Sequence, residues 1–485
     1  MTSATGPTPR SRTVLPSTAR RLDLLTARAQ SAGRLPSLSD AVQRDGELVW
    51  SRQIGALAYG PDGTPTGSPT PSTPYRIGSI TKSFTAVLLL QLRDDGALAL
   101  TDPLADHLPG APARIRDAFA RVRLGDVAAH RGGLAREPDG PWWERTAGPA
   151  AVDFLAARTP ADLRTRTAEL PGHHYSNLGY GLLGAVVEIH RARPWRDVLA
   201  ERVLAPLGMA ATACAPVGAA PTGYSVHPWC DELHPEPTPD TGAMAPAGQL
   251  WSTLADLGRW GSFLADPAGV DPAGAVLAAA SVAQLRTSRG PAVEGEPTGP
   301  AGGRGGDGDG DGGDGYALGL STWSAGGRLL VGHGGSMPGF LAGLVFHPAS
   351  RAVAVSFASS YTGLDPTGHA AAMLTTLLDA EPTEPAPWRP VVPEPAVREL
   401  LGSWWWGDVE LLATCRGGDG AVLTLGGRRG ATSELVAEDA STWRGRSGEH
   451  TGELLTVRRD PAGVPVELTL STYRLGRRPY EVPLT

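Results

Sequence analysis

The chain has 485 residues, of which 41% are hydrophobic and 19% are charged, and its formal net charge is −7 at pH 7. This size predicts two or three packed domains, and the negative net charge argues against nucleic acid as a partner because it gives no excess of basic residues. No stretch approaches the ~18–20 consecutive apolar residues of a membrane helix, and residues 1–20 lack the apolar core of a secretory signal. We therefore expect a cytoplasmic protein that does not span a membrane.

The N-terminal region is predicted to pass from disorder into a helix and then a strand. Residues 1–17 are rich in Thr, Pro, Ser and Arg, which is typical of a disordered segment. Residues 19–32 carry leucines at helical spacing, and residues 48–58 alternate like a β-strand after a turn at residues 44–46. Residues 60–74 are rich in Gly, Pro, Thr and Ser, and we expect a loop there.

The next segment holds the only lysine of the chain. Of the 43 Lys and Arg residues in the chain, only Lys82 is a lysine. It lies three positions after Ser79 and directly before an apolar stretch, residues 83–92. Residues three apart share a face of a helix, so the hydroxyl and the amine can meet. A buried lysine can lose its proton and act as a base, which an arginine cannot do. An N-cap serine beside a solvated lysine is the alternative, and the absence of any other lysine favours the Ser–Lys pair.

Helices are predicted from here to about residue 265, separated by loops rich in Pro and Gly. This region contains the only asparagine, Asn177, directly after Tyr175 and a serine. Tyr175 could be an ordinary core aromatic, but beside the single asparagine we interpret it as facing a site. The pair His173–His174 has no third ligand at a metal-binding spacing, so we interpret both as loop histidines. The pair Trp142–Trp143 is a candidate for the wall of a pocket.

The last part of this domain is predicted to return to β-structure. Residues 290–315 form a low-complexity run of Gly, Asp and Pro, which we interpret as a flexible surface insertion. Segments with strand character follow at residues 316–323, 328–332, 340–346 and 352–358, and a helix is predicted at residues 369–378. Strands at both ends of the domain, with helices between them, predict a sheet flanked by helices over residues 18–380.

A separate C-terminal domain is expected after a Pro-rich linker at residues 381–395. Residues 396–485 contain short alternating segments with Gly turns between them, which predicts a small β-barrel or sandwich. The chain has three cysteines, an odd number that is typical of reduced thiols, although a pairing of Cys214 with Cys230 stays open.

Three short polar motifs occur in order, at Ser79–Lys82, Tyr175–Asn177 and His333–Gly335. Together they resemble the three motifs of the serine β-lactamase and penicillin-binding-protein superfamily. The resemblance is to the class C β-lactamases and their relatives, the family VIII carboxylesterases, D-alanyl-D-alanine carboxypeptidases and D-aminopeptidases. It covers roughly residues 18–380. It implies an α/β (α+β) fold of the β-lactamase/transpeptidase type, with an antiparallel sheet, a helical lobe and an active site between them.

The resemblance also implies a serine hydrolase that works through an acyl-enzyme. Ser79 would be the nucleophile, and Lys82, its pKa lowered by burial, would take and return the proton together with Tyr175. Tyr175 would also be the base for deacylation by water. The backbone N–H groups of Ser79 and Ser336 would form the oxyanion hole. No metal or organic cofactor is implied, and the partner would be a small-molecule substrate.

The remaining motif residues are implied to bind that substrate. Asn177 would hold Lys82 and the acyl side of the substrate, and Gly335 would let the substrate approach the backbone before Ser336. His333, mostly neutral near pH 7, stands where β-lactamases usually carry a lysine. This difference favours a small ester, amide or D-amino-acid peptide over a β-lactam. A true β-lactamase and a catalytically silent binding protein on the same fold are the alternatives, and the oligomeric state is left open.

Overall fold

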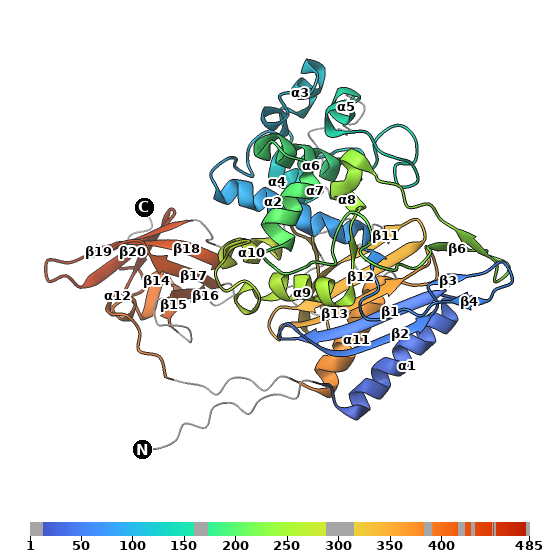
Figure 1. Cartoon of the computed structure of the whole chain (residues 1–485). Coiled ribbons are helices and arrows are strands. Elements are labelled where there is room, and N and C mark those ends of the chain that lie inside the picture. Colours follow the sequence, from blue (N-terminus) through green and yellow to red (C-terminus); the bar gives the residue numbers. More distant parts are fainter. Residues whose placement is uncertain are drawn as a thin grey trace. The chain divides into compact units, whose positions relative to one another are not determined.

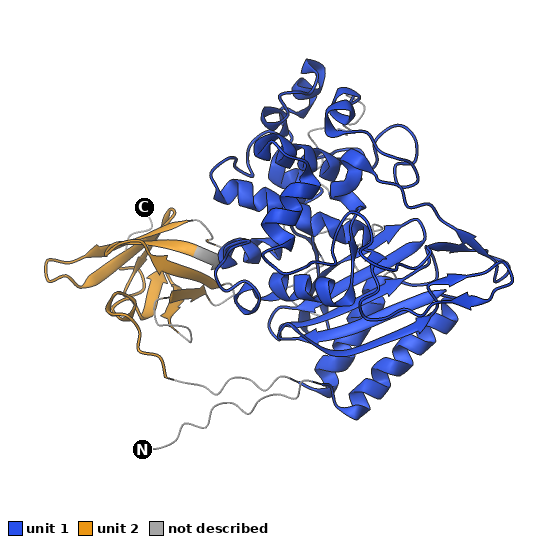
Figure 2. Cartoon of the chain, viewed as in Figure 1, with its two compact units in different colours: residues 1–383 blue, residues 384–485 orange. Residues whose placement is uncertain are grey.

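The computed structural model describes residues 13–159, 173–287, 315–382, 390–415, 422–427, 432–448, 450 and 453–481. The chain divides into two compact units, Met1–Thr383 and Glu384–Thr485 (Figure 2). The predicted insertion at residues 290–315 lies outside the described residues except for Gly315. The middle of the predicted linker and most of the predicted N-terminal disordered segment lie outside them as well.

A seven-stranded antiparallel sheet forms the centre of the first unit (Figure 1). Its strands, in spatial order, are β2 (Glu47–Gly55), β1 (Ser37–Arg44), β13 (Ala352–Ala358), β12 (Phe340–His347), β11 (Arg328–Met337), β10 (Ser321–Ala325) and β9 (Gly315–Tyr316). Because β1 pairs with β13, the sheet joins the two ends of the unit. This arrangement confirms the predicted antiparallel sheet.

Helices cover both faces of the sheet, because successive side chains of a strand point to opposite faces. In β12, Leu344 belongs to the core on one face and Val345 to the core on the other. Helices α1 (Pro16–Ala32) and α11 (Pro366–Ala380) pack on the face of Val345, whereas α9 (Leu254–Ala265) packs on the opposite face (Figure 1). The central strands are therefore buried on both sides.

The helical lobe is built around α2 (Thr81–Asp94), which is buried on all sides along residues 81–92. Residues 84–92 of this helix are mostly apolar, which is typical of a helix enclosed in a core. The other elements between the two parts of the sheet are α3 (Ala113–Phe119), α4 (Leu124–Ala128), α5 (Ala151–Ala156), α6 (Asn177–Arg191), α7 (Trp195–Leu199), α8 (Ala245–Gly248) and α10 (Ala279–Leu285), with the short strands β3 (Ala58–Tyr59), β4 (Pro65–Thr66), β5 (Tyr75–Arg76), β6 (Tyr224–Val226), β7 (Leu233–Pro235) and β8 (Trp251–Ser252). This lobe confirms the predicted helical region.

Strand β1 is the main element that the sequence pattern does not predict. Its polar side chains are buried rather than exposed, so the strand lacks the expected alternation. Ser39 donates to the hydroxyl of Tyr75 at 3.1 Å, and the side-chain amide of Gln43 donates to the carbonyl of Leu254 at 3.2 Å. Buried polar groups are tolerated when such partners satisfy them. The strand is therefore stabilised by tertiary hydrogen bonds that its own sequence does not reveal.

The first helix begins earlier than predicted. Helix α1 starts at Pro16, and Val14 is already buried, so the disorder predicted for residues 1–17 is wrong for the last residues of that segment. Proline favours the first helical position because its φ is preset and its missing N–H would have no helical partner there.

The second unit is a closed barrel of eight strands, which confirms the predicted all-β C-terminal domain. After the short helix α12 (Pro395–Arg398), its strands are β14 (Gly402–Trp406), β15 (Val409–Thr414), β16 (Val422–Gly427), β17 (Thr432–Ala437), β18 (Thr442–Gly448), β19 (Leu454–Arg459), β20 (Pro465–Leu470) and β21 (Tyr473–Gly476). Trp404 and Trp443 are fully buried in its core. The pairing of β14 with β21 closes the barrel, so each of its described strands has a partner on both sides.

A buried ion pair between Asp40 and His369 ties β1 to α11 and makes stability depend on pH. The His369 Nε2 lies 2.7 Å from the Asp40 Oδ2. Burial opposes the imidazolium, but the charge and hydrogen bond of Asp40 outweigh it and raise the pKa of His369. A raised folded-state pKa contributes stability that is complete below the unfolded-state pKa of about 6.5 and is lost as the pH rises through the folded-state pKa. We expect the unfolding free energy of the wild type to fall relative to that of His369→Gln as the pH rises above 6.5.

Urea unfolding of both proteins between pH 6 and pH 9 measures this difference. Loss of either partner of a buried pair should cost about 3–5 kcal/mol where the pair is fully formed. The matched variant Asp40→Asn should lose the same pH dependence. A wild-type advantage that stays constant over the whole range would show that His369 contributes no charge.

Candidate active site

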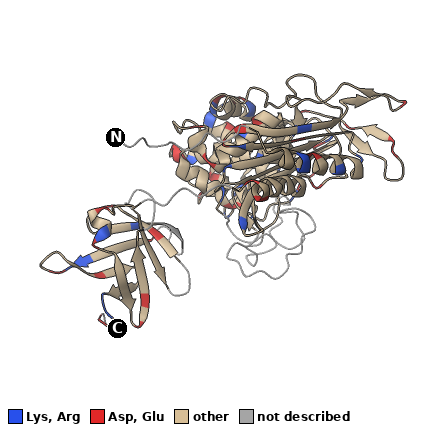
Figure 3. Cartoon of the chain, turned by 90° about the horizontal axis from the view of Figure 1, so that it is seen from below, with Lys and Arg blue, Asp and Glu red and all other residues tan. Residues whose placement is uncertain are grey.

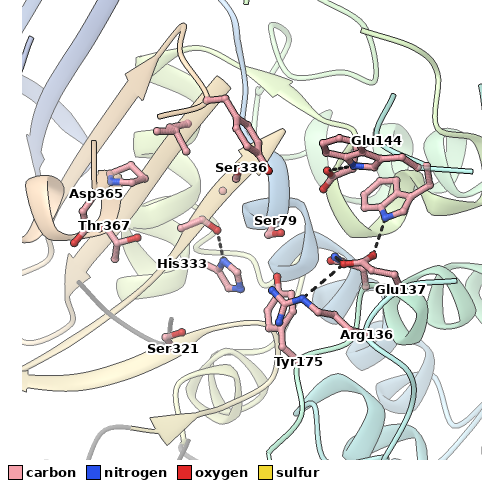
Figure 4. A pocket seen from close by; sticks show the side chains of 18 of the residues that line it. Ser79, Arg136, Glu137, Glu144, Tyr175, Ser321, His333, Ser336, Asp365 and Thr367 are labelled. Carbon is pink, nitrogen blue, oxygen red and sulfur yellow. Dashed lines mark hydrogen bonds and ion pairs between the residues drawn. The ribbon is translucent and has the colours of Figure 1, made fainter. Parts of the chain in front are cut away.

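A cavity of about 840 Å³ lies where the sheet meets the helical lobe, and the three sequence motifs converge on it (Figure 4). The predicted site residues that line it are Ser79, Tyr175, Asn177, His333, Gly335 and Ser336. Lys82 is fully buried directly behind Ser79. Residues from β11, from the start of α6 and from the turn before α2 are thus brought to one place, although more than 250 positions separate the first from the last.

The Ser79 turn is held against strand β11 by two glycines. Ser79 lies in a 3₁₀ turn, Gly78–Ile80, which leads directly into α2. Gly78 has a φ of 49°, and a Cβ atom there would lie 2.5 Å from the Ser336 nitrogen. A Cβ atom on Gly335 would lie 1.9 Å from the Ile77 carbonyl oxygen. Side chains at either position would push the two segments apart, so this close approach requires glycine.

Lys82 lies in the first turn of α2 and reaches back to Ser79. Its Nζ donates to the Ser79 Oγ at 2.9 Å and to the Ala247 carbonyl at 2.8 Å. Burial lowers its pKa to about 7, against the opposing charges of Glu137 and Glu144. A substantial fraction of the amine is therefore unprotonated near neutral pH, and in that form it can accept a proton from Ser79.

Tyr175 precedes helix α6 and faces Ser79. Ser176 is the N-cap of this helix, where its Oγ accepts from the Gly179 N–H at 2.9 Å, and its own N–H donates to the Nδ1 of His130 at 3.0 Å. The Lys82 Nζ lies 4.8 Å from the centre of the Tyr175 ring. Burial raises the pKa of Tyr175 above its ordinary value, although its hydrogen bond with Ser79 opposes that shift. The phenol therefore stays protonated near neutral pH.

Asn177 lines the cavity but lacks the contact with Lys82 that the family resemblance implied. Its Nδ2 donates to the Glu137 Oε1 at 2.7 Å, whereas the amine of Lys82 donates to Ser79 and to a carbonyl. The Glu137 carboxylate therefore orients the side-chain amide through its Nδ2. The Asn177 Oδ1 is buried and has no hydrogen-bond partner.

His333 lies inside β11, which continues to Met337 rather than ending at residue 332 as predicted. Its Nε2 is 3.0 Å from the Tyr316 hydroxyl, and its Nδ1 lies close to the Gly334 carbonyl. Burial, together with the charge of Lys82, lowers the pKa of His333 to about 3. The side chain is therefore neutral near pH 7, as expected for a histidine.

A loop between α4 and α5 supplies charged residues that the sequence analysis missed. Arg136, Glu137 and Glu144 line the cavity. The indole of Trp143 donates to Glu137 and that of Trp142 donates to Glu144, each at 2.8 Å. The two tryptophans, which were candidates for the pocket wall, therefore also orient two carboxylates. The sequence signal that could have found these carboxylates is the position of Glu137 and Glu144 close to the Trp142–Trp143 pair.

Other sequence-based expectations can be placed on the structure. Within the described residues, His173 and His174 belong to no group of three or more side chains that could hold a metal. Cys214, Cys230 and Cys415 are free thiols, so the open pairing is not formed. No helix in the described part of the chain is long and apolar enough to cross a membrane. Basic and acidic residues are interspersed along the elements of each unit (Figure 3).

Two family models match the chain. One, described as beta-lactamase, matches residues 22–387, and the other, described as a domain of unknown function (DUF7586), matches residues 393–477. Penicillin-binding protein 4 of Amycolatopsis lactamdurans is 30% identical over 227 residues, which cover 45% of this chain and 57% of that protein. Esterase EstB of Burkholderia gladioli is 32% identical over 237 residues, which cover 46% of this chain and 57% of that protein. The chain thus spans little more than half the length of these relatives.

Solved structures of low sequence identity share the fold. The octameric penicillin-binding protein homologue from Pyrococcus abyssi has a TM-score of 0.60 at 21% identity, with 94% of this chain and 99% of that chain covered. The D-amino acid amidase from Ochrobactrum anthropi SV3 has a TM-score of 0.54 at 22% identity, with 75% of this chain and 98% of that chain covered. These likenesses confirm the β-lactamase/transpeptidase-like fold predicted for the first unit.

The pKa of Lys82 predicts how the reactivity of Ser79 depends on pH. Only the neutral amine can take the proton of Ser79, so the rate of labelling by a fluorophosphonate should rise with pH, with a midpoint near 7. In Glu144→Gln the midpoint should move to lower pH, because an anion that favours the charged amine is gone. Intact-mass measurement of labelled protein from pH 5 to pH 9 gives both midpoints. A labelling rate independent of pH would contradict the assignment of Lys82 as the base.

Proposed function

This chain belongs to the beta-lactamase family, and we propose that it is a serine hydrolase that cleaves an ester or amide bond of a small substrate through an acyl-enzyme on Ser79. The observation that carries the proposal is the 2.9 Å contact between the Ser79 Oγ and the buried Nζ of Lys82. Serine is a weak nucleophile until a neighbouring base removes its proton. A lysine with a pKa of about 7 is suited to that task at neutral pH.

In the proposed first step, the Ser79 Oγ attacks the substrate carbonyl while neutral Lys82 accepts the hydroxyl proton. Negative charge then develops on the carbonyl oxygen, which we place between the backbone N–H groups of Ser79 and Ser336. The close approach of the turn to β11 at Gly78 and Gly335 supports this placement, because it sets both N–H groups at the same end of the cavity.

Collapse of the tetrahedral intermediate requires a proton on the leaving group. We assign its transfer to the hydroxyl of Tyr175, which lines the cavity, hydrogen-bonds with Ser79 and would be resupplied by Lys82. Since burial raises the pKa of Tyr175, we assign it the role of a relay rather than that of a free phenolate base. Water would then attack the acyl-enzyme, with its proton passing through the same hydroxyl to Lys82. Lys82 would return a proton to the Ser79 Oγ as the bond between that oxygen and the acyl carbon breaks, which releases the acid and restores neutral Lys82.

The substrate class follows from the side chains on the third motif. A neutral His333 lacks the positive charge with which a lysine would attract the carboxylate of a β-lactam. We therefore propose esters, amides or short D-amino-acid peptides as substrates, and the names of the esterase and amidase relatives support this choice. We also propose a reducing compartment, the cytoplasm, in keeping with three free thiols. Cell fractionation would test that location.

Replacement of Lys82 by arginine tests the base directly. Lys82→Arg keeps the positive charge but cannot accept a proton, so kcat on a p-nitrophenyl ester should fall on the order of 10²–10⁴-fold. The measurement is kcat together with the thermal unfolding midpoint of both proteins.

Two further variants complete that comparison. Ser79→Ala should abolish turnover and fluorophosphonate labelling while leaving the unfolding midpoint nearly unchanged, because it removes one partly exposed hydroxyl. Lys82→Met removes the charge while keeping a similar side-chain volume. It therefore still tests the loss of the base if the arginine variant does not fold. An active Lys82→Arg enzyme would overturn the mechanism, and wild-type protein that neither labels nor turns over would favour a silent binding protein.

A second prediction separates an esterase from a β-lactamase. The wild type should cleave p-nitrophenyl butyrate with a kcat/KM at least ~10-fold above that for nitrocefin, because each 1.4 kcal/mol of lost binding to the drug carboxylate costs tenfold. Steady-state kinetics on both substrates with one enzyme preparation measure the ratio. Equal or faster hydrolysis of nitrocefin would make β-lactamase activity the better assignment.

A further inference from the structure

His130 is a buried histidine that the proposed mechanism does not use. It lies in the turn after α4, is 1% exposed and is outside the set of described residues that line the cavity. Its backbone has a φ of 56°, which lies in the left-handed region that residues other than glycine rarely adopt. Such a conformation persists only where the surrounding contacts stabilise it.

Two of these contacts hold the backbone on both sides of Tyr175. The His130 carbonyl accepts from the His174 N–H at 2.7 Å, and the His130 Nδ1 accepts from the Ser176 N–H at 3.0 Å. One residue therefore binds the backbone N–H groups of the residues directly before and directly after the tyrosine.

The imidazole of His130 also packs on the ring of Tyr175. The two ring centres are 4.2 Å apart, and the ring planes are tilted by 39°. The Lys82 Nζ and the Arg136 guanidinium lie 4.8 Å and 5.2 Å from the centre of the same tyrosine ring. The phenol is thus enclosed by three side chains, of which that of His130 also bonds to the adjoining backbone.

His130 can accept from the Ser176 N–H only while its Nδ1 carries no proton, so the proton of the neutral imidazole lies on Nε2. Burial, together with the charge of Lys82, lowers the pKa of His130 well below its ordinary value. The pKa of Lys82 is about 7. The acceptor is therefore present over the pH range in which Lys82 titrates.

We propose that His130 is the positioning residue for Tyr175, and that it sets the distance between the phenol hydroxyl and the leaving group of the substrate. The inference rests on the proposed hydrolysis at Ser79, in which Tyr175 donates the proton that the leaving group needs. A displacement of ~1 Å can cost ~10²-fold in rate, because proton transfer requires hydrogen-bond distance.

The test compares two esters of butyric acid that differ in the leaving group. Ethyl butyrate releases an alkoxide that has to be protonated as the bond breaks, whereas p-nitrophenyl butyrate releases a stable phenolate that needs no proton. Both esters give the same acyl-enzyme, so the comparison of kcat/KM reports on acylation. We expect only the ethyl ester to depend on the position of Tyr175.

Two variants remove parts of His130 without straining its backbone, because glycine and asparagine both adopt a positive φ. His130→Gly removes the ring and the acceptor. It should lower kcat/KM at least ~10-fold for ethyl butyrate and less than ~3-fold for p-nitrophenyl butyrate. His130→Asn offers its Oδ1 as the acceptor and lacks the ring. We expect it to recover most of that loss and to keep a smaller loss on ethyl butyrate alone.

The Tyr175→Phe background shows whether His130 acts through the tyrosine. The His130 ring also lies 4.6 Å from that of Tyr316, which lines the cavity and contacts His333, so a second route to the site exists. If Tyr175 transmits the effect, His130→Gly should change kcat/KM for ethyl butyrate by less than ~2-fold in this background.

His369→Gln is the control for a loss of stability. It removes a buried histidine from its ion pair with Asp40, and His369 is not among the residues that line the cavity. The unfolding midpoint should fall, while the ratio of kcat/KM for the two esters should stay at the wild-type value.

The outcomes separate this inference from the proposed function. An equal loss on both esters, or a loss of the same size in the Tyr175→Phe background, would overturn the role of His130 alone. Wild-type protein that cleaves p-nitrophenyl butyrate but not ethyl butyrate would overturn it as well. Absence of all turnover and of fluorophosphonate labelling would overturn the proposed function and this inference with it. If His130→Gly does not fold, His130→Asn decides, since either no loss or an equal loss on both esters would contradict the inference.

Discussion

Burial of a single amine beneath a serine is the constraint on which the rest of this structure depends. Lys82 can approach neutrality only because α2 is enclosed by the helical lobe, which removes water from around its charge. It can serve Ser79 only because the 3₁₀ turn before the helix brings the hydroxyl within 2.9 Å. The apolar packing of the lobe and the chemistry of the pocket are therefore consequences of the same helix.

The sheet contributes a second, independent requirement. Strand β11 must approach the Ser79 turn so closely that neither Gly78 nor Gly335 can carry a side chain. That position is maintained by strands from both ends of the unit, including β1, whose buried polar groups bond to Tyr75, Leu254 and His369. Polar contacts within the core thus support the geometry of a site that they do not touch.

The charges around the cavity show how one loop can tune reactivity. Glu137 and Glu144 both oppose the fall in the pKa of Lys82 that burial causes. The indoles of Trp142 and Trp143 hold these same carboxylates in place on the cavity wall.

The sequence by itself determined the fold class, the order of the motifs and part of the set of residues that meet at the pocket. It could do so because Lys82 and Asn177 are single residues of their kind within short motifs, and because apolar periodicity records which segments are buried. The all-β character of the second unit was visible for the same reason. These properties depend on residues that are close together in the sequence, so they can be recognised without the tertiary structure.

Only the tertiary structure decided which partners each polar group finds. Asn177 bonds to Glu137 rather than Lys82, β1 buries polar side chains, and β11 runs on through His333, each because of residues distant in sequence. The neutral state of His333 was expected from its type, but the depth of its pKa shift depends on burial. Hydrogen bonding and desolvation depend on what surrounds a group in space, and a sequence without its fold does not specify those surroundings.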